Sequence, residues 1–266
     1  MSGFDYSILK HSAHRPWPMP SGPWVMTQTW CDLLFAHWRV NASELRAKVP
    51  PEFTLDLFDG SAWLGIVAFH VTNVAPRGVP ALRWVSEFPE LNVRTYVRVA
   101  DEPGIFFFSL DAGSALAVHA AKTMLNLPYF TASMSAARDA DVVRYQSRRD
   151  AFRGEAAFRA SCGPVGPART AARGSLEYFL TERYCLYNLN HHDEPYRLDI
   201  HHLPWPLRPA RADISVNTMA EVNGIQLPDE APLLHFVERQ DMVAWMPLSL
   251  VRRTDFALQP SMESEA

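Results

Sequence analysis

Short segments with a strand-like pattern of apolar and polar residues make up most of the chain, and many of them are separated by Gly, Pro, Asp or Asn. The segments with this pattern are WCDLLFAHW (30–38), SAWLGIVAFHV (61–71), LNVRTYVRV (91–99), IFFFSLD (105–111), VVRYQSR, GEAAFRAS, LEYFLTERYCLY, YRLDIHH, LLHFVER and MVAWMPL. They predict a predominantly antiparallel β protein of the α+β class. Two helices are predicted, SELRAKV with Asn41 or Ser43 as N-cap, and SALAVHAAKTMLN with Ser114 as N-cap.

The segment FPELNVRTYV (88–97) has one polar and one apolar face. Because side chains alternate along a strand, Glu90, Asn92, Arg94 and Tyr96 share one side. This side is either ordinary solvated surface or the polar wall of a site. Glu90 and Arg94 could also neutralise one another as a structural bridge.

The strand register decides which polar groups meet in the hairpin that ADEPG closes at 100–104. If Val99 pairs with Gly104, Arg94 lies opposite Ser109 and Asn92 opposite Asp111, and these groups form one cluster. The other register places Arg94 opposite Leu110 and separates the cluster.

A second polar segment, LEYFLTERYCLY (176–187), is also interpreted as a strand, with Glu182 and Tyr184 on the same face as Leu180. A carboxylate and a phenol inside a cavity could perform acid–base chemistry, but periodicity leaves the inward face undecided. His202 closes the nearby strand YRLDIHH. The adjacent histidines of NHHDEP are expected at a hairpin tip, and their spacing does not predict a metal site.

Covalent chemistry has one lysine candidate. The chain has three lysines, and Lys122 alone lies in apolar sequence, one helical turn from His119. It would be a Schiff-base amine if desolvated, or an ammonium extending from a helix into solvent. The sequence contains no G-x-S-x-G, Walker or G-x-G-x-x-G motif, and we predict no cofactor.

Charge and composition exclude several classes of partner. The chain has 25 Lys and Arg against 29 Asp and Glu, and acidic residues interleave with the arginines of 138–173, so no nucleic-acid binding is predicted. No stretch approaches the roughly 20 apolar residues that cross a bilayer, so no membrane association is expected. Three widely spaced cysteines favour the reducing cytoplasm.

The chain is expected to form one folded domain over 24–253, between mobile flanks at 1–23 and 254–266. One interior break in composition, SCGPVGPARTAARGS (161–175), predicts a long loop rather than a domain boundary. Exposed strand edges would suit a homo-oligomer, but no interface is indicated.

Seven ordered motifs resemble the YqjF-like family, whose function is unknown and which is related to acetoacetate decarboxylase. They are WCDLLFAHW, FDGSAWLGIVAF, FPELNVRTYV, FFFSLDA, LPYFTASM, FLTERY and HHLPWPL, from about Thr27 to Arg252. The resemblance implies a single-domain, cone-shaped antiparallel β-barrel with a few peripheral helices and a small-molecule cavity.

The resemblance also implies roles for individual residues. Where the decarboxylases carry Pro-Lys-Lys, this chain reads Leu127-Pro128-Tyr129-Phe130, which does not support an imine mechanism. The polar face of 88–97 is brought near the cavity, where Arg94 would hold a carboxylate or enolate and Glu90 would move a proton. Tyr129 would fill the volume of the missing lysines.

The expected function is therefore binding of a small carboxylate- or carbonyl-bearing metabolite, with lyase- or isomerase-type proton transfer as the candidate chemistry. The alternative is a non-catalytic binding or structural protein that kept the fold. The candidate catalytic residues are Glu90, Arg94 and Lys122, and the candidate substrate-binding residues are Asn92, Tyr96, Ser109, Tyr129, Glu182 and His202.

Overall fold

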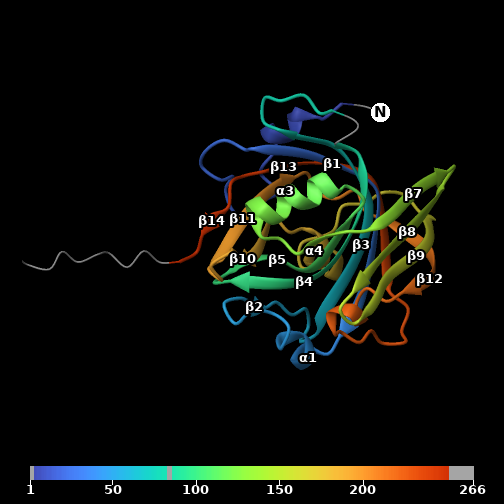
Figure 1. Cartoon of the computed structure of the whole chain (residues 1–266). Helices are drawn as coiled ribbons and strands as arrows, with labels where there is room; N and C mark the ends of the chain where they lie inside the picture. Colours follow the sequence, from blue (N-terminus) through green and yellow to red (C-terminus); the bar gives the residue numbers. More distant parts are fainter. Residues whose placement is uncertain (1–2, 83–85, 252–266) are drawn as a thin grey trace, which may run out of the picture.

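The structure is a computed structural model that describes residues 3–82 and 86–251. Within these residues, fourteen strands form one sheet (Figure 1). The strands are β1 (Met26–Val40), β2 (Thr54–Leu55), β3 (Ala62–Pro76), β4 (Phe88–Val99), β5 (Glu102–Ala112), β6 (Tyr129–Thr131), β7 (Ser133–Asp139), β8 (Val142–Ala151), β9 (Gly154–Pro164), β10 (Cys185–Leu189), β11 (Pro195–His202), β12 (Arg208–Asn217), β13 (Leu233–Ala244) and β14 (Leu248–Ser249). The helices are η1 (Tyr6–Lys10), α1 (Ala42–Arg46), α3 (Ala115–Leu125), α4 (Leu176–Thr181) and η2 (Glu221–Asn223).

In the described chain, part of the sheet closes into a ring. The strand order β11-β10-β5-β4-β3-β1-β13 returns to its start because β11 also pairs with β13, with Ile200 opposite Ala244. Closure gives each strand of the ring an inner and an outer face. The prediction of a mostly β, α+β fold with few helices is confirmed.

Beyond β13, the strands β12, β9, β8 and β7 extend the sheet to one side of the ring (Figure 1). The Arg-rich segment 138–173 lies mainly here, and its burial alternates along β8. Arg144 and Arg148 are exposed while Val143 and Tyr145 are buried in the core against the ring. Arg144 and Arg148 therefore belong to the outer face of a half-buried strand.

The two predicted helices begin where the caps indicated. The Asn41 side chain accepts hydrogen bonds from the backbone N–H groups of Ser43 and Glu44 at the start of α1. Ser114 accepts one from the backbone N–H of Ala117 at the start of α3. Asn126 ends α3 in the left-handed region with φ of 48°, a position that tolerates asparagine.

Neither of the two registers considered for β4 and β5 forms. In the register that forms, Arg94 lies opposite Phe107, and a bulge between Val93 and Arg94 places Ser109 opposite Val93. Val97, rather than Val99, pairs with Gly104. An inserted residue changes which side chains share a face, and strand periodicity alone does not reveal it.

The predicted strand at 176–187 is also wrong in its first half. Residues Leu176–Thr181 form the short helix α4, whose N-cap Ser175 accepts a hydrogen bond from the backbone N–H of Tyr178. Leu176 and Leu180 pack with Tyr96 against the end of the ring. This i, i+4 spacing fits a helix, and β10 begins only at Cys185.

The N-terminal segment lies against the ring. Ile8 is 2% exposed, and its carbonyl oxygen is hydrogen-bonded to Nε2 of His201 at 2.9 Å. Arg15 donates to the carbonyl oxygen of Ile200 at 2.7 Å. The single domain and the mobility of 1–23 stay predictions, and the C-terminal flank 254–266 lies outside the described residues.

Candidate functional site

The ring encloses a cavity of about 590 Å³. Most of its wall is apolar and comes from the inner faces of the ring strands together with one side of α3. Apart from Tyr129 and the tryptophans, the polar residues in its wall are Gln28, Glu90, Asn92, Arg94, Thr181, Arg183 and His202. The volume and the mixture of a large apolar wall with a few polar groups are typical of small-molecule sites.

Strand β4 supplies the central polar strip. Glu90, Asn92 and Arg94 all line the cavity and are 5%, 4% and 6% exposed, which settles the direction of the polar face. The intervening Leu91 and Val93 pack on the other side in the hydrophobic core. The alternation that predicted a shared face is confirmed, and the face points inward rather than to solvent.

Arg94 has little compensation for its charge. Its Nη2 donates to the carbonyl oxygen of Leu180 at 3.2 Å, and its Nε has no hydrogen-bond partner. The guanidinium lies 5.1 Å from the ring centre of Phe35. No carboxylate in the described chain forms an ion pair with Arg94, so the structural bridge to Glu90 is not formed. A buried guanidinium in this state favours an anion beside it.

Glu90 has one hydrogen-bond partner, the hydroxyl of Tyr129, which donates at 3.1 Å. Burial raises the pKa of Glu90 to about 8, although the bond from Tyr129 acts to lower it. Burial and the neighbouring Glu90 raise the pKa of Tyr129 well above its ordinary value. Glu90 is therefore mainly a neutral acid near pH 7, able to donate a proton.

Two further cavity-lining residues have unsatisfied polar atoms. Asn92 Oδ1 and the indole Nε1 of Trp205 are buried and have no hydrogen-bond partner. Trp205 stacks on Trp30, with ring centres 5.6 Å apart. Buried polar groups usually have a hydrogen-bond partner. A ligand donor would satisfy Asn92 Oδ1, and a ligand acceptor would satisfy Trp205 Nε1.

Arg183 is the second arginine of the cavity and is fully compensated. Its Nη1 donates to Asp56 Oδ2 at 2.7 Å, and its Nε donates to the carbonyl oxygen of Phe179 at 2.7 Å. Burial lowers its pKa while Asp56 acts in the opposite direction. The sequence reasoning did not select Arg183, because a strand interpretation of 176–187 could not decide the inward face.

Tyr96 lies beneath both arginines rather than in the cavity wall. The guanidinium carbons of Arg94 and Arg183 are 5.8 Å and 5.0 Å from its ring centre. Its hydroxyl is 2.7 Å from Nε2 of His37, which is fully buried. Burial, with Arg94 and His235 adding to it, lowers the pKa of His37 well below its ordinary value. Tyr96 thus positions the two arginines and does not reach the cavity.

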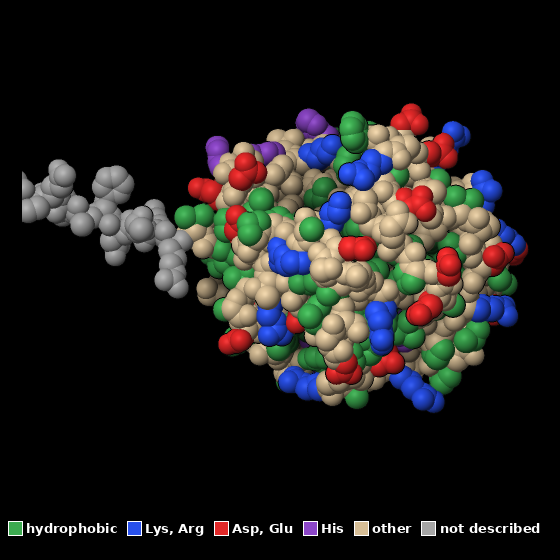
Figure 2. Space-filling model, turned by 90° about the horizontal axis from the view of Figure 1, so that it is seen from below, with side chains coloured by type: hydrophobic (Ala, Val, Ile, Leu, Met, Phe, Trp, Pro, Cys, Tyr) green, Lys and Arg blue, Asp and Glu red, His purple; other side chains and the backbone are tan. Residues whose placement is uncertain are grey.

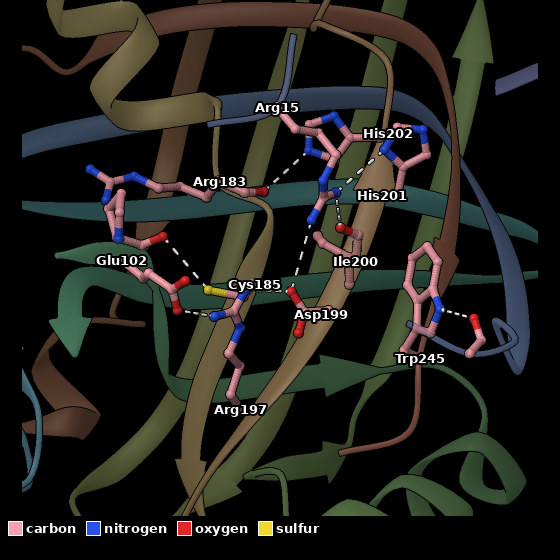
Figure 3. A network of polar contacts seen from close by, with 12 residues as sticks. Arg15, Glu102, Arg183, Cys185, Arg197, Asp199, Ile200, His201, His202 and Trp245 are labelled. Carbon is pink, nitrogen blue, oxygen red and sulfur yellow. Dashed lines mark hydrogen bonds and ion pairs between the residues drawn. The ribbon is translucent and has the colours of Figure 1, made fainter. Parts of the chain in front are cut away.

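His202 lines the cavity, and backbone groups hold its ring, of which Figure 3 shows the carbonyl of Arg183. Its Nδ1 is 2.7 Å from the carbonyl oxygen of Leu203, and its Nε2 is 3.2 Å from that of Arg183. Burial lowers its pKa to about 4, so the ring is neutral near pH 7. Its ring stacks on Tyr184 at 4.7 Å.

A polar network continues behind His202 toward the N-terminal segment (Figure 3). Arg15 Nη2 lies 3.8 Å from Asp199 Oδ1, and the same oxygen accepts a 2.6 Å hydrogen bond from Arg197 Nη2. Arg15 further stacks on Tyr184, 4.9 Å from its ring centre. These contacts hold the N-terminal segment against the outer face of β11.

Besides Tyr96, three expected site residues lie elsewhere. Lys122 is exposed and lies 5.0 Å from the ring centre of Phe130, outside the cavity wall. Ser109 points away from the cavity and accepts a hydrogen bond from Asn223 at 3.2 Å. The Glu182 carboxylate accepts hydrogen bonds from the backbone N–H of Trp205 at 2.9 Å and from the Tyr184 hydroxyl. The structure therefore brings together Glu90, Asn92, Arg94, Tyr129 and His202 but not these three.

The described residues contain no group of three or more His, Cys, Asp and Glu side chains positioned to hold a metal ion. Nor does any helix among them have the length and apolar character needed to span a membrane. Acidic and basic side chains are interspersed over the face that Figure 2 shows.

Comparisons with known proteins agree with this architecture. Residues 27–241 match the family of uncharacterized conserved proteins described by DUF2071. The chain is 47% identical over 227 residues to the uncharacterized protein YqjF of Bacillus subtilis strain 168, covering 85% of this chain and 93% of that protein.

Solved structures extend the comparison to the fold. An acetoacetate decarboxylase matches with a TM-score of 0.58 and 12% identity, over 92% of this chain and 98% of its own. The acetoacetate decarboxylase of Legionella pneumophila matches with a TM-score of 0.58 and 13% identity, over 94% and 96%. The enduracididine biosynthesis enzyme MppR, in complex with pyruvate, matches with a TM-score of 0.57 and 10% identity, over 94% and 99%. At these identities the likeness concerns the fold alone.

Proposed function

The chain belongs to the DUF2071 family, and from this premise we propose that it binds a small carboxylate- or carbonyl-bearing metabolite in the ring cavity and catalyses a lyase- or isomerase-type proton transfer. On this proposal the seven-strand ring corresponds to the cone-shaped barrel that the resemblance implied.

The observation that carries the proposal is the contrast between the two cavity arginines. Arg183 has its carboxylate, Asp56, at 2.7 Å, whereas Arg94 has a backbone carbonyl as its hydrogen-bond partner. A ligand carboxylate or enolate beside Arg94 would supply the missing charge and accept from its free donors. The free oxygen of Asn92 would accept a hydrogen bond from a ligand hydroxyl.

Glu90 supports the proton transfer. Its raised pKa, about 8, leaves it mainly protonated at neutral pH. Delivery of this proton to the carbanion or enolate left when a substrate C–C bond breaks forms a C–H or O–H bond, breaks the O–H bond of Glu90 and leaves its carboxylate, which then accepts a proton from water or from the next substrate. The Tyr129 hydroxyl would stabilise that carboxylate through its existing hydrogen bond.

The proposal does not use an imine. The three lysines of the chain are Lys10, Lys48 and Lys122, and none of them lines the cavity. A Schiff base requires an amine at the reacting carbonyl. The same observation favours the second candidate function, a non-catalytic binding protein whose cavity retains Arg94 but performs no chemistry.

The first test is binding of acetoacetate and pyruvate, measured by calorimetry, to the wild type and to Arg94→Met. We expect Arg94→Met to weaken binding at least tenfold. Arg39→Met is the matched control, because Arg39 is exposed on β1 outside the cavity wall. Equal binding by wild type and Arg94→Met would refute the carboxylate site.

The second test separates the two candidate functions. Solvent deuterium incorporation into the carbon next to the ligand carbonyl is followed by NMR for the wild type and Glu90→Gln. Incorporation that the wild type accelerates and Glu90→Gln abolishes supports catalysis. Normal binding without accelerated exchange in the wild type supports the binding protein.

A further inference from the structure

The cavity divides into a polar end and an apolar end. Arg94 contacts the carbonyl oxygen of Leu180 at the C-terminal end of α4, whereas Glu90 contacts Tyr129 in the strand that follows α3. The polar strip therefore begins near α4, and α3 lies toward its other end.

The apolar end is built from both α3 and the ring strands. One face of α3 lines the cavity through Ala117, Ala120, Ala121 and Met124. Their i, i+3, i+4 and i+7 spacing places them on the same side of the helix. The opposing wall is formed by strands β10, β11 and β13 through Leu186, Leu198, Ile200 and Met242.

The rim of the cavity is apolar as well. Met124 is 71% exposed and Met246 is 63% exposed, and both line the cavity. Large apolar side chains exposed at the opening of a cavity suit the passage of an apolar group. A ligand as small and polar as acetoacetate would leave most of this wall without contacts.

We propose that the ligand is an amphipathic monocarboxylic acid, whose carboxylate pairs with Arg94 and whose apolar tail lies between α3 and the strands β10, β11 and β13. This inference rests on the proposed function, because it uses the same carboxylate site. It adds the substrate class: an acid with a chain or ring of about six carbons or more, rather than a keto acid of three or four carbons.

The test is a series of straight-chain acids from acetate to decanoate, with binding measured by calorimetry and by quenching of tryptophan fluorescence, since Trp30 and Trp205 line the cavity. We expect affinity to rise by about three- to fourfold for each added methylene until the cavity is filled. Octanol, which has the tail without the charge, is expected to bind at least tenfold more weakly than octanoate.

Two variants locate the ligand. Ala121→Trp, which fills the tail region beside α3, is expected to weaken octanoate binding at least tenfold and to leave acetate binding unchanged. Ala115→Trp is the control on the exposed start of the same helix, outside the cavity wall. Arg94→Met is expected to remove the preference for octanoate over octanol.

The outcomes separate the two proposals. Binding of short acids that depends on Arg94 but does not increase with chain length would overturn the inference and leave the proposed function standing. Tight binding of octanoate and octanol alike, unaffected by Arg94→Met, would overturn the carboxylate site and with it both proposals. Failure of all the acids to bind would also overturn both proposals.

Discussion

The hydroxyl of Tyr129 donates to the carboxyl of Glu90 across 3.1 Å, and this is the one hydrogen bond that the described chain provides to the Glu90 side chain. The pair joins the short strand that follows α3 to the polar strip of β4. Burial raises the pKa of Glu90, and the bond from Tyr129 limits that rise, so the tyrosine tunes the acid on which the proposed chemistry depends.

Replacing Tyr129 by Phe is expected to raise the pKa of Glu90 above its value of about 8, because the one donor that the described residues offer to the carboxylate is removed while burial remains. The measurement is an NMR titration of the ¹³C-labelled Glu90 carboxyl in both proteins. Tyr178→Phe, at a tyrosine outside the cavity wall, is the control. A fall in the pKa of Glu90 in Tyr129→Phe would contradict the assigned role.

Glu90 should make the stability of the protein depend on pH. Its carboxyl keeps a proton to about pH 8 in the folded chain but only to about pH 4.5 in the unfolded chain, so its contribution is fully present below about pH 4.5 and is lost as the pH rises through 8. Relative to Glu90→Gln, the wild type should lose up to about 5 kcal/mol of unfolding free energy by pH 9. Urea unfolding from pH 5 to 9 measures the difference. The exposed Glu52→Gln should follow the wild type.

The stability of the protein should respond differently to loss of a charge at the two arginines of the cavity wall. Asp56→Ala leaves the buried Arg183 without its carboxylate and should cost about 3 to 5 kcal/mol of stability. Arg94→Met removes a buried charge that has no such partner, and should change stability by less than about 1 kcal/mol. Urea unfolding at pH 7 tests both, and a larger loss in Arg94→Met than in Asp56→Ala would show that Arg94 is compensated in the free protein.

Gly65 provides space for the groups that surround the polar end of the cavity. A methyl group at this position would lie 3.0 Å from Cδ2 of His37 and 3.3 Å from Cγ of Arg94. Gly65→Ala should therefore displace one of these side chains, cost about 1 to 3 kcal/mol of stability and weaken Arg94-dependent binding. Gly3→Ala is the control, because no atom lies within 4 Å of its added methyl group. Wild-type stability and binding in Gly65→Ala would contradict the packing argument.

Local pattern was sufficient for much of the fold. The period-two alternation of β4 correctly grouped Glu90, Asn92 and Arg94, because successive side chains of a strand must point to opposite faces. Asn41 and Ser114 correctly marked the starts of two helices, because side-chain capping depends on residues only two or three positions away.

Which residues meet in the cavity was decided by the tertiary structure. Closure of the ring through β11 and β13 turned the polar face of β4 inward, whereas the strand alone allowed either direction. The bulge before Arg94 carried Ser109 to the other face, and α4 turned Glu182 toward Trp205 while leaving Arg183 in the wall. The packing of α3 directed Ala117, Ala120 and Ala121 toward the cavity and left Lys122 in solvent. The physical reason is that a sequence determines periodicity and caps through near neighbours, but inside and outside are defined only when residues distant in the chain pair and enclose a volume.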